Sequence, residues 1–201
     1  AIEKSKEIAK VNSLSENELG SEIAKTLDNI RKRVVYQFQS YDAIEKLIKN
    51  QEAKLASIPA IQPVSNKQLN RIASGFGMRI HPIYGIAKMH PGLDFTAPQG
   101  TPIYATGDGI VTAAGSGTGT GNYVLINHGY GYETKYLHMV RIKATAGKPV
   151  KRGEVIGWVG STGASTGPHC HYEVHINGNP VDPVYFFFND LSPEQFDLLL
   201  K

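Results

Sequence analysis

The distribution of glycine is the feature that most constrains the fold of this chain. Of its 21 glycines, only Gly20 precedes residue 71, and the other twenty fall in residues 71–201. Glycine is unfavourable inside helices and common in the turns between strands. The distribution therefore predicts an α+β chain, in which a long N-terminal helix or helical arm is followed by a mainly antiparallel β domain with a groove.

Residues 1–58 carry the pattern of a long, coiled-coil-like helix. Ser13-Leu14-Ser15-Glu16 can form a capping box, with Glu16 reaching back to the cap. Apolar residues then recur at steps of three and four: Ile23, Leu27, Ile30, Val34, Phe38, Tyr41, Ile44 and Ile48. Pro59 and Pro63 would end the helix. Its apolar stripe must be buried on the C-terminal domain, on the N-terminal arm or on a second chain, so intramolecular packing and a helix-mediated dimer both stay open.

The rest of the chain divides into three parts. We predict an extended linker over residues 59–71, because prolines disfavour helix there. Residues 72–188 should form the β domain, since short runs of β-branched and aromatic residues alternate with turn residues. The expected strands are Thr101–Ala105, Gly109–Ala114, Tyr123–His128, Glu133–Met139, Val155–Val159 and His169–His175. A short helix, capped at Ser192-Pro193, is expected over residues 189–201.

Composition narrows the class of function. Hydrophobic residues make up 41% of the chain and charged residues 19%, as in folded proteins. The net charge of +3 is spread evenly, so we expect no nucleic-acid partner. No run approaches the roughly 20 apolar residues of a membrane span. The single cysteine, Cys170, excludes an intrachain disulfide.

Two short motifs bring together residues that can bind a metal. His169 and His171 lie two apart in an expected strand, so they share a face. His90 and Asp94 flank a Pro-Gly pair that makes a helix improbable, and we expect a turn to deliver the first and a strand the second. His90, Asp94 and one histidine of the pair would be the three ligands of a catalytic zinc site. An aspartate braced by a histidine is the alternative that spacing leaves open.

A fourth histidine, His138, would extend this site. Alternation along its strand predicts that Tyr132, Thr134, Tyr136 and His138 share one face. If that strand neighbours the strand of His169 and His171, then His138 and the non-ligand histidine would flank a metal-activated water. One would take the proton and the other would orient the water or stabilise the developing oxyanion.

Together these motifs resemble the LytM/lysostaphin-type zinc metalloendopeptidases, peptidase family M23. The resemblance covers roughly residues 72–185 and is carried by Gly75-Phe76-Gly77-Met78-Arg79-Ile80-His81-Pro82, His90-Pro91-Gly92-Leu93-Asp94-Phe95, Gly100-Thr101-Pro102-Ile103, Tyr136-Leu137-His138 and Gly167-Pro168-His169-Cys170-His171-Tyr172-Glu173. It implies that His90, Asp94 and His171 bind one Zn²⁺ ion per chain. It also implies that His138 and His169 are the catalytic histidines. Cys170 departs from the aliphatic residue common in the family, and it points away from the histidines towards the core.

Three further residues are candidates for the substrate groove. Arg79 could steady a carbonyl or carboxylate, with a surface salt bridge as the alternative. His81, in the loop entering the groove, could touch substrate or be a simple turn histidine. Tyr136 is placed in the groove by its alternation with His138.

The resemblance implies a zinc-dependent endopeptidase that hydrolyses peptide crosslinks of bacterial peptidoglycan. The alternative within the family is a catalytically silent LytM-type binding or activator module for other cell-wall hydrolases, and the presence of all five site residues favours the enzyme. Residues 146–157 also look like the turn-rich part of a biotinyl/lipoyl-type carrier barrel, but a carrier leaves the histidines and Asp94 unexplained.

The implied location is the cell envelope, periplasmic or extracellular. The chain begins at Ala1 without a methionine, so we expect the targeting segment to be absent from this chain. A membrane anchor upstream of it stays open.

Overall fold

The computed structural model describes residues 15–80 and 85–187. The predicted C-terminal helix over residues 189–201 and the candidate groove residue His81 lie outside the described residues. The chain divides into two compact units, residues 1–51 and residues 52–201. Each unit is described by itself.

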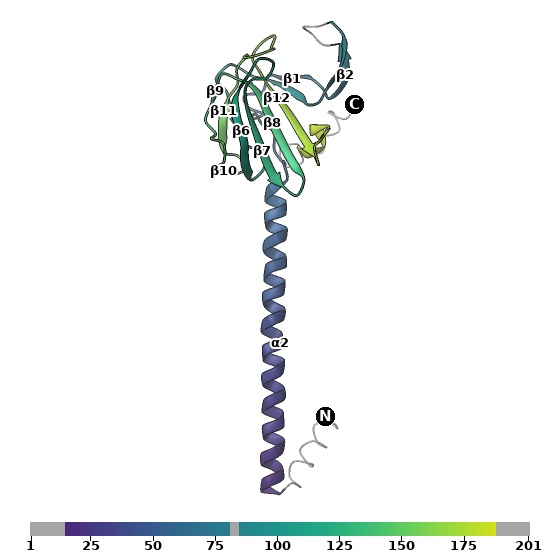
Figure 1. Cartoon of the computed structure of the whole chain (residues 1–201), viewed down its shortest axis with the longest axis vertical. Helices are drawn as coiled ribbons and strands as arrows, with labels where there is room; N and C mark the ends of the chain where they lie inside the picture. The colour runs from purple at the N-terminus through teal and green to yellow at the C-terminus, as the bar shows by residue number, and fades with distance from the viewer. Residues whose placement is uncertain (1–14, 81–84, 188–201) are drawn as a thin grey trace. The chain divides into compact units, whose positions relative to one another are not determined.

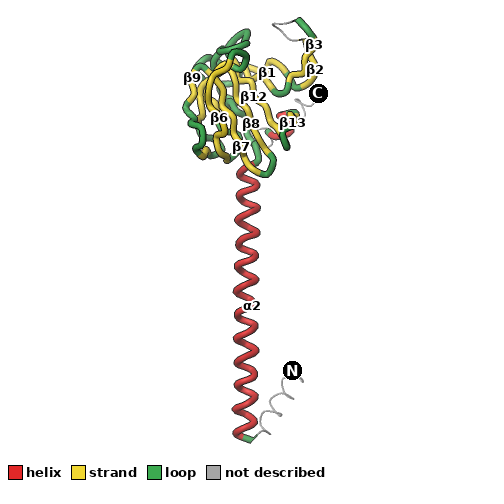
Figure 2. Tube along the Cα trace, in the orientation of Figure 1, coloured by secondary structure: helices red, strands yellow, loops and turns green. Residues whose placement is uncertain are grey.

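Helix α2 (Glu16–Ser57) is 42 residues long (Figures 1 and 2). The backbone N–H and the hydroxyl of Ser15 both donate to Glu18 Oε2, at 2.9 and 2.6 Å. This capping box lies two residues beyond the predicted one, so the helix begins later than the sequence pattern indicates. The helix ends before Pro59, as predicted. The apolar residues of the predicted stripe, from Ile23 to Ile48, are between 41% and 66% exposed.

The second unit confirms the predicted β architecture. The strands are β1 (Arg71–Ser74), β2 (Gly77–Ile80), β3 (Ala87–His90), β4 (Leu93–Thr96), β5 (Pro102–Tyr104), β6 (Gly109–Gly117), β7 (Gly121–Gly129), β8 (Tyr132–Met139), β9 (Arg141–Ile142), β10 (Pro149–Val150), β11 (Val155–Trp158), β12 (His169–Ile176) and β13 (Asn179–Val181), followed by the 3₁₀ helix η1 (Pro183–Phe186). The main sheet is antiparallel, in the order β1-β4-β12-β8-β7-β6-β10, with β13 paired to β12. A smaller sheet has the order β5-β11-β9, and β2 pairs with β3.

Strand β12 lies inside the main sheet, between β4 and β8. Figure 1 shows it beside β8. One of its faces carries Cys170, Tyr172 and Val174 into the hydrophobic core, where each is fully buried. The other face carries His169 and His171, because side chains alternate along a strand. In register, His171 faces Asp94 of β4 and Leu137 of β8. The sheet thus brings together motifs that are far apart in the sequence.

The segment predicted as a linker packs closely against the β domain. It has no helix or strand between residues 58 and 70. The Ala60 N–H donates to the Thr106 carbonyl at 3.0 Å, the Tyr104 N–H donates to the Pro63 carbonyl at 2.9 Å, and Val64 is fully buried. The end of α2 is held as well, since Arg152 Nη2 donates to the carbonyls of Leu55, Ala56 and Ile58. The sequence-based domain boundaries stay a prediction.

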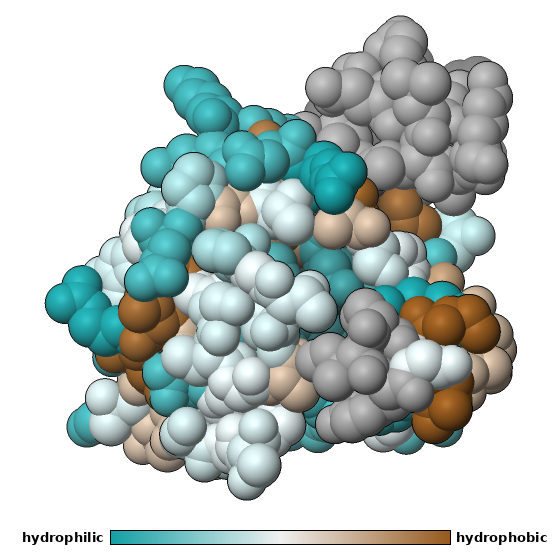
Figure 3. Space-filling view, turned by 90° about the horizontal axis from the view of Figure 1, so that it is seen from above, coloured by the Kyte–Doolittle hydropathy of each residue, from teal (hydrophilic) through white to brown (hydrophobic). Residues whose placement is uncertain are grey.

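Within the described residues, no helix combines the length and apolar character that crossing a membrane requires. The space-filling view shows one face of the molecule, on which hydrophilic and weakly polar residues predominate and hydrophobic ones appear in separate patches (Figure 3).

Candidate metal centre and groove

Two neighbouring strands and the tight turn between them deliver His90 and Asp94. His90 is the last residue of β3 and Asp94 lies in β4. Between them, Gly92 packs against β12 so closely that a Cβ atom would lie 2.2 Å from the Tyr172 carbonyl oxygen. Only glycine fits at this contact, which lets β4 pair with β12 and places Asp94 opposite His171.

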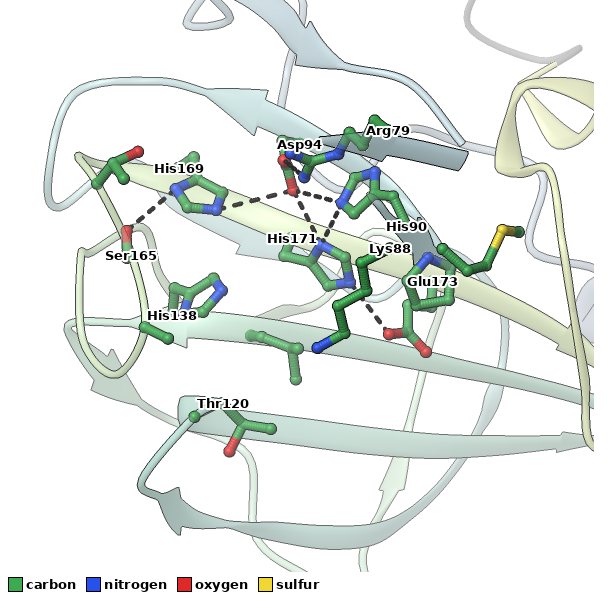
Figure 4. A pocket seen from close by; sticks show the side chains of 16 residues that line it. Arg79, Lys88, His90, Asp94, Thr120, His138, Ser165, His169, His171 and Glu173 are labelled. Carbon is green, nitrogen blue, oxygen red and sulfur yellow. Dashed lines mark hydrogen bonds and ion pairs between the residues drawn. The ribbon is translucent and has the colours of Figure 1, made fainter. Parts of the chain in front are cut away.

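Three side-chain atoms converge at this point (Figure 4). Asp94 Oδ1 lies 3.2 Å from His90 Nε2 and 2.8 Å from His171 Nδ1, and the two nitrogens are 3.0 Å apart. Among the described residues, His90, Asp94 and His171 form a group of potential ligands whose atoms all lie within 4.8 Å of one another. These are the three residues that the family resemblance implies as metal ligands.

The remaining atoms of all three side chains have other partners. His90 Nδ1 lies 2.7 Å from the Gly75 carbonyl, and His171 Nε2 lies 3.0 Å from Glu173 Oε1. Both partners are acceptors, so each can take the ring proton and leave the other nitrogen, His90 Nε2 or His171 Nδ1, with its lone pair. Arg79 Nη2 donates to Asp94 Oδ2 at 3.2 Å. His90 Nε2, His171 Nδ1 and Asp94 Oδ1 are therefore left as three converging acceptors, an arrangement that fits a cation.

The pKa values around this cluster reflect the same convergence. Burial acts to raise the pKa of Asp94, but its close contacts with the His171 and His90 rings outweigh burial and hold that pKa well below its usual range. Burial acts to lower the pKa of His171, but hydrogen bonds to Asp94 and Glu173 outweigh it and raise that pKa above its ordinary value. The site thus favours positive charge between these groups.

His138 and His169 stand next to each other beside the cluster, with ring centroids 4.8 Å apart (Figure 4). His138 Nδ1–H donates to the Thr162 carbonyl and His169 Nδ1–H donates to the Gly167 carbonyl, each at 2.8 Å. Each ring therefore leaves its Nε2 for other contacts, and His169 Nε2 lies 3.7 Å from Asp94 Oδ1. Burial lowers the pKa of His138 to about 4, so this ring is neutral at neutral pH.

The predicted shared face of Tyr136 and His138 is wrong. Tyr136 is fully buried, and its hydroxyl accepts from the Thr106 N–H at 3.0 Å. The register of β8 against β7 shifts between Tyr136 and Met139, and His138 adopts the left-handed φ of 63°. This bulge interrupts the alternation and turns His138 towards the groove while Tyr136 stays in the core. Tyr136 is therefore not a groove residue.

Polar side chains line much of the groove around the cluster. Its lining includes Arg79, Lys88, Thr120, Ser165 and Thr166, together with the four histidines and Asp94. Arg79, predicted to steady a carbonyl or carboxylate, lies at this groove and pairs with Asp94.

Sequence reasoning missed Glu173. It lies on the same face of β12 as His169 and His171, and it is only 5% exposed. Burial acts to raise its pKa, but hydrogen bonds from His171 and His175 lower it to about 2. The alternation of His169, His171, Glu173 and His175 was the signal that could have found it.

Comparisons with known proteins all find peptidases. The profile described as peptidase family M23 matches residues 88–183. The chain is 54% identical over 114 residues to the DD-carboxypeptidase/endopeptidase Mpg of Neisseria meningitidis, covering 57% of this chain and 26% of that protein. It is also 46% identical over 121 residues to the peptidoglycan DD-endopeptidase ShyA of Vibrio cholerae, covering 60% of this chain and 28% of that protein. The chain thus spans about a quarter of the length of these curated relatives.

Among solved structures, the catalytic domain of the antimicrobial peptidase lysostaphin from Staphylococcus simulans is similar with a TM-score of 0.55 and 34% identity. That match covers 60% of this chain and 92% of the lysostaphin domain.

Proposed function

Because this chain belongs to peptidase family M23, we propose that it is a zinc-dependent endopeptidase that hydrolyses peptide crosslinks of bacterial peptidoglycan. The observation that carries the proposal is the convergence of His90 Nε2, His171 Nδ1 and Asp94 Oδ1 beside a pair of histidines whose Nδ1 atoms are already bonded. The names of the relatives, which describe DD-carboxypeptidase and DD-endopeptidase activities, support the choice of substrate.

We propose that His90, Asp94 and His171 hold one zinc ion per chain. Two histidine nitrogens and one carboxylate oxygen are a ligand set of catalytic zinc sites, which keep a fourth position for water or substrate. When bound, zinc would lower the pKa of a water molecule towards about 7 and polarise the scissile carbonyl. Arg79 would keep Asp94 Oδ2 occupied, so that Oδ1 remains available to the metal.

The two other histidines divide the remaining chemistry. His138 is neutral, because burial lowers its pKa to about 4, and its Nε2 can accept the proton of the attacking water. His169 stands beside it and can orient that water or donate a hydrogen bond to the developing oxyanion. The carbonyls of Thr162 and Gly167 hold both rings in the required tautomer.

The test uses the full chain loaded with zinc, with purified sacculi as substrate and mass analysis of the released peptides. We expect about one zinc per chain and release of crosslink peptides. His138→Asn and His169→Asn should each lose activity by about 100-fold or more, the contribution typical of a general acid or base. Asparagine suits position 138 because it tolerates positive φ. Both variants should keep zinc.

His128→Gln is the matched control, since His128 is a buried histidine of β7 that does not line the groove. It should keep activity. A wild-type chain that binds zinc but releases no peptide would favour the alternative, a silent activator module for other hydrolases. A wild-type chain that binds no zinc would contradict the metal site itself.

The proposed substrate implies a place of action. We propose that the chain acts in the cell envelope, periplasmic or extracellular, where peptidoglycan lies.

We propose also that the exposed stripe of α2 pairs with the same helix of a second chain. Leu27, Val34, Tyr41, Ile48 and Leu55 recur every seven residues, and seven-residue repeats favour coiled coils. A membrane anchor upstream of this chain stays open.

A further inference from the structure

Glu173 is a buried carboxylate that contacts the proposed zinc ligand His171. It lies on the side of the His171 ring away from the converging ligand atoms. It lies two residues beyond His171 on the same face of β12, and its Oε1 lies 3.0 Å from His171 Nε2 (Figure 4). His171 Nδ1 faces Asp94 and His90 on the opposite side of the ring. The His171 imidazole therefore contacts two carboxylates, one through each ring nitrogen.

The second oxygen of Glu173 is held as firmly as the first. Glu173 Oε2 accepts from His175 Nε2 at 2.6 Å and from Lys135 Nζ at 3.1 Å. His175 lies on the same strand, and Lys135 lies directly opposite Glu173 on β8. With both oxygens engaged and the side chain only 7% exposed, the carboxylate has little freedom to rotate away from His171.

This arrangement determines which nitrogen of His171 can bind a metal. An ionised carboxylate only accepts hydrogen bonds. When a cation lies between His171 Nδ1, Asp94 and His90, Glu173 would therefore hold the remaining ring proton on Nε2 and leave the lone pair of Nδ1 to that cation. A carboxylate behind a ligating histidine also makes the ring a stronger base than a neutral partner does. The corresponding partner of His90 is the uncharged Gly75 carbonyl.

We propose that Glu173 is a positioning residue that fixes the tautomer and orientation of His171 and strengthens zinc binding. His175 and Lys135 hold Glu173 in place from the other side. The inference rests on the proposed zinc site and extends it by a residue that binds neither metal nor substrate.

The experiment measures zinc affinity of the full chain by competition with a chelator of known affinity. Glu173→Gln keeps the shape of the side chain and removes its charge, and Glu173→Ala removes the acceptor as well. Loss of such a partner typically weakens metal binding about 10- to 100-fold. We expect the glutamine variant near the lower end of this range and the alanine variant near the upper end.

Glu133→Gln provides the matched control. Glu133 is an exposed carboxylate on β8, two residues from Lys135, and it lies opposite His175 in register. The Glu133→Gln substitution removes the same charge from the neighbouring strand and leaves the contacts of the proposed ligands unchanged. The zinc affinity of Glu133→Gln should stay close to that of wild type, while the affinity of Glu173→Gln falls about 10-fold.

A second readout separates positioning from general stability. In the zinc-loaded wild type, the imidazole Nε2–H of His171 should give a downfield, slowly exchanging proton signal in NMR spectra, because it donates to a buried carboxylate. In Glu173→Gln this signal should move upfield even if the unfolding temperature is unchanged. If Glu173 served only in packing, the chemical shift of the His171 Nε2 proton would stay the same in Glu173→Gln.

The outcomes are distinguishable. Wild-type affinity in both Glu173 variants, or an unmoved His171 signal in Glu173→Gln, would overturn this inference and leave the zinc site standing. A wild-type chain that binds no zinc would remove the proposed function and this inference together.

Discussion

At the scale of single residues, the site depends on where each histidine carries its proton. His90, His138 and His169 direct Nδ1–H to main-chain carbonyls, and His171 directs Nε2 to Glu173. A main-chain carbonyl cannot change its protonation state, so the tautomers of His90, His138 and His169 are set by the fold rather than by pH. Two chemically identical groups, His169 and His171, thereby present different nitrogens to the groove.

A histidine outside the site predicts a pH dependence of stability. His128 is 5% exposed, and burial lowers its pKa below the ordinary value of about 6.5. The unfolded chain therefore takes up a proton at higher pH than the folded one. The contribution of neutral His128 to the free energy of unfolding is fully present above about pH 6.5 and is lost as pH falls through the folded-state pKa.

We expect His128→Gln to remove this part of the pH dependence. Denaturant unfolding of both proteins between about pH 8 and pH 5 should give a smaller loss of stability on acidification for the variant. The proposed metal ligands titrate in both proteins, so their effect cancels in the comparison. Parallel stability curves would show that His128 is not the group responsible.

At the scale of elements, strand pairing aligns the proposed ligands, and two local irregularities adjust the positions of the site residues. The antiparallel register of β4 and β12 sets Asp94 directly opposite His171. The bulge near the end of β8 redirects His138, and the glycine between β3 and β4 allows the close approach to β12. Each feature moves a functional side chain without altering the sheet order.

Gly92→Ala should separate β4 from β12. Its Cβ atom would lie 2.2 Å from the Tyr172 carbonyl oxygen, so the backbone must shift, at a cost of about 1–3 kcal/mol for such overpacking. We expect a lower unfolding temperature and weaker zinc binding, since Asp94 follows Gly92 by two residues. Gly119→Ala is the control, because a Cβ atom there meets nothing within 4 Å and its φ is not positive. Equal zinc affinity in Gly92→Ala and wild type would contradict this reading.

At the scale of the whole molecule, the chain divides into a helical unit and a β unit that includes the end of the helix. The division falls between residues 51 and 52, ahead of the predicted linker. Residues Ala60 and Val64 belong to the core of the β unit, since both are buried. A deletion that removes the helix and keeps the β unit intact should therefore end at residue 51.

We predict that residues 52–201 fold alone and bind zinc as tightly as the full chain. A chain starting at residue 65 should unfold at a lower temperature, because it loses buried Ala60 and Val64 and the hydrogen bonds that Ala60 and Pro63 make with the β domain. If α2 pairs with a second copy, light scattering should give a dimer mass for the full chain and a monomer mass for residues 52–201. A monomeric full chain would contradict helix-mediated pairing.

The sequence by itself determined what depends on local pattern. Glycine distribution and residue alternation predicted the α+β class and the principal strands, and the His90-Asp94 and His169-His171 spacings indicated a metal cluster. The predictions of fold class and strands succeed because chain conformation over a few residues follows from local sterics and burial. Spacing left open which histidine of the pair is the ligand, and the family resemblance supplied that assignment.

Only the tertiary structure decided what depends on contacts between distant segments. Alternation put Tyr136 and His138 on one face, but pairing of β8 with β7 creates the bulge that separates them. Glu173 gained a role only when the fold set His171, His175 and Lys135 around its carboxylate. The physical reason is that register, bulges and buried hydrogen bonds are settled by the free energy of the whole sheet, which no short stretch of sequence contains.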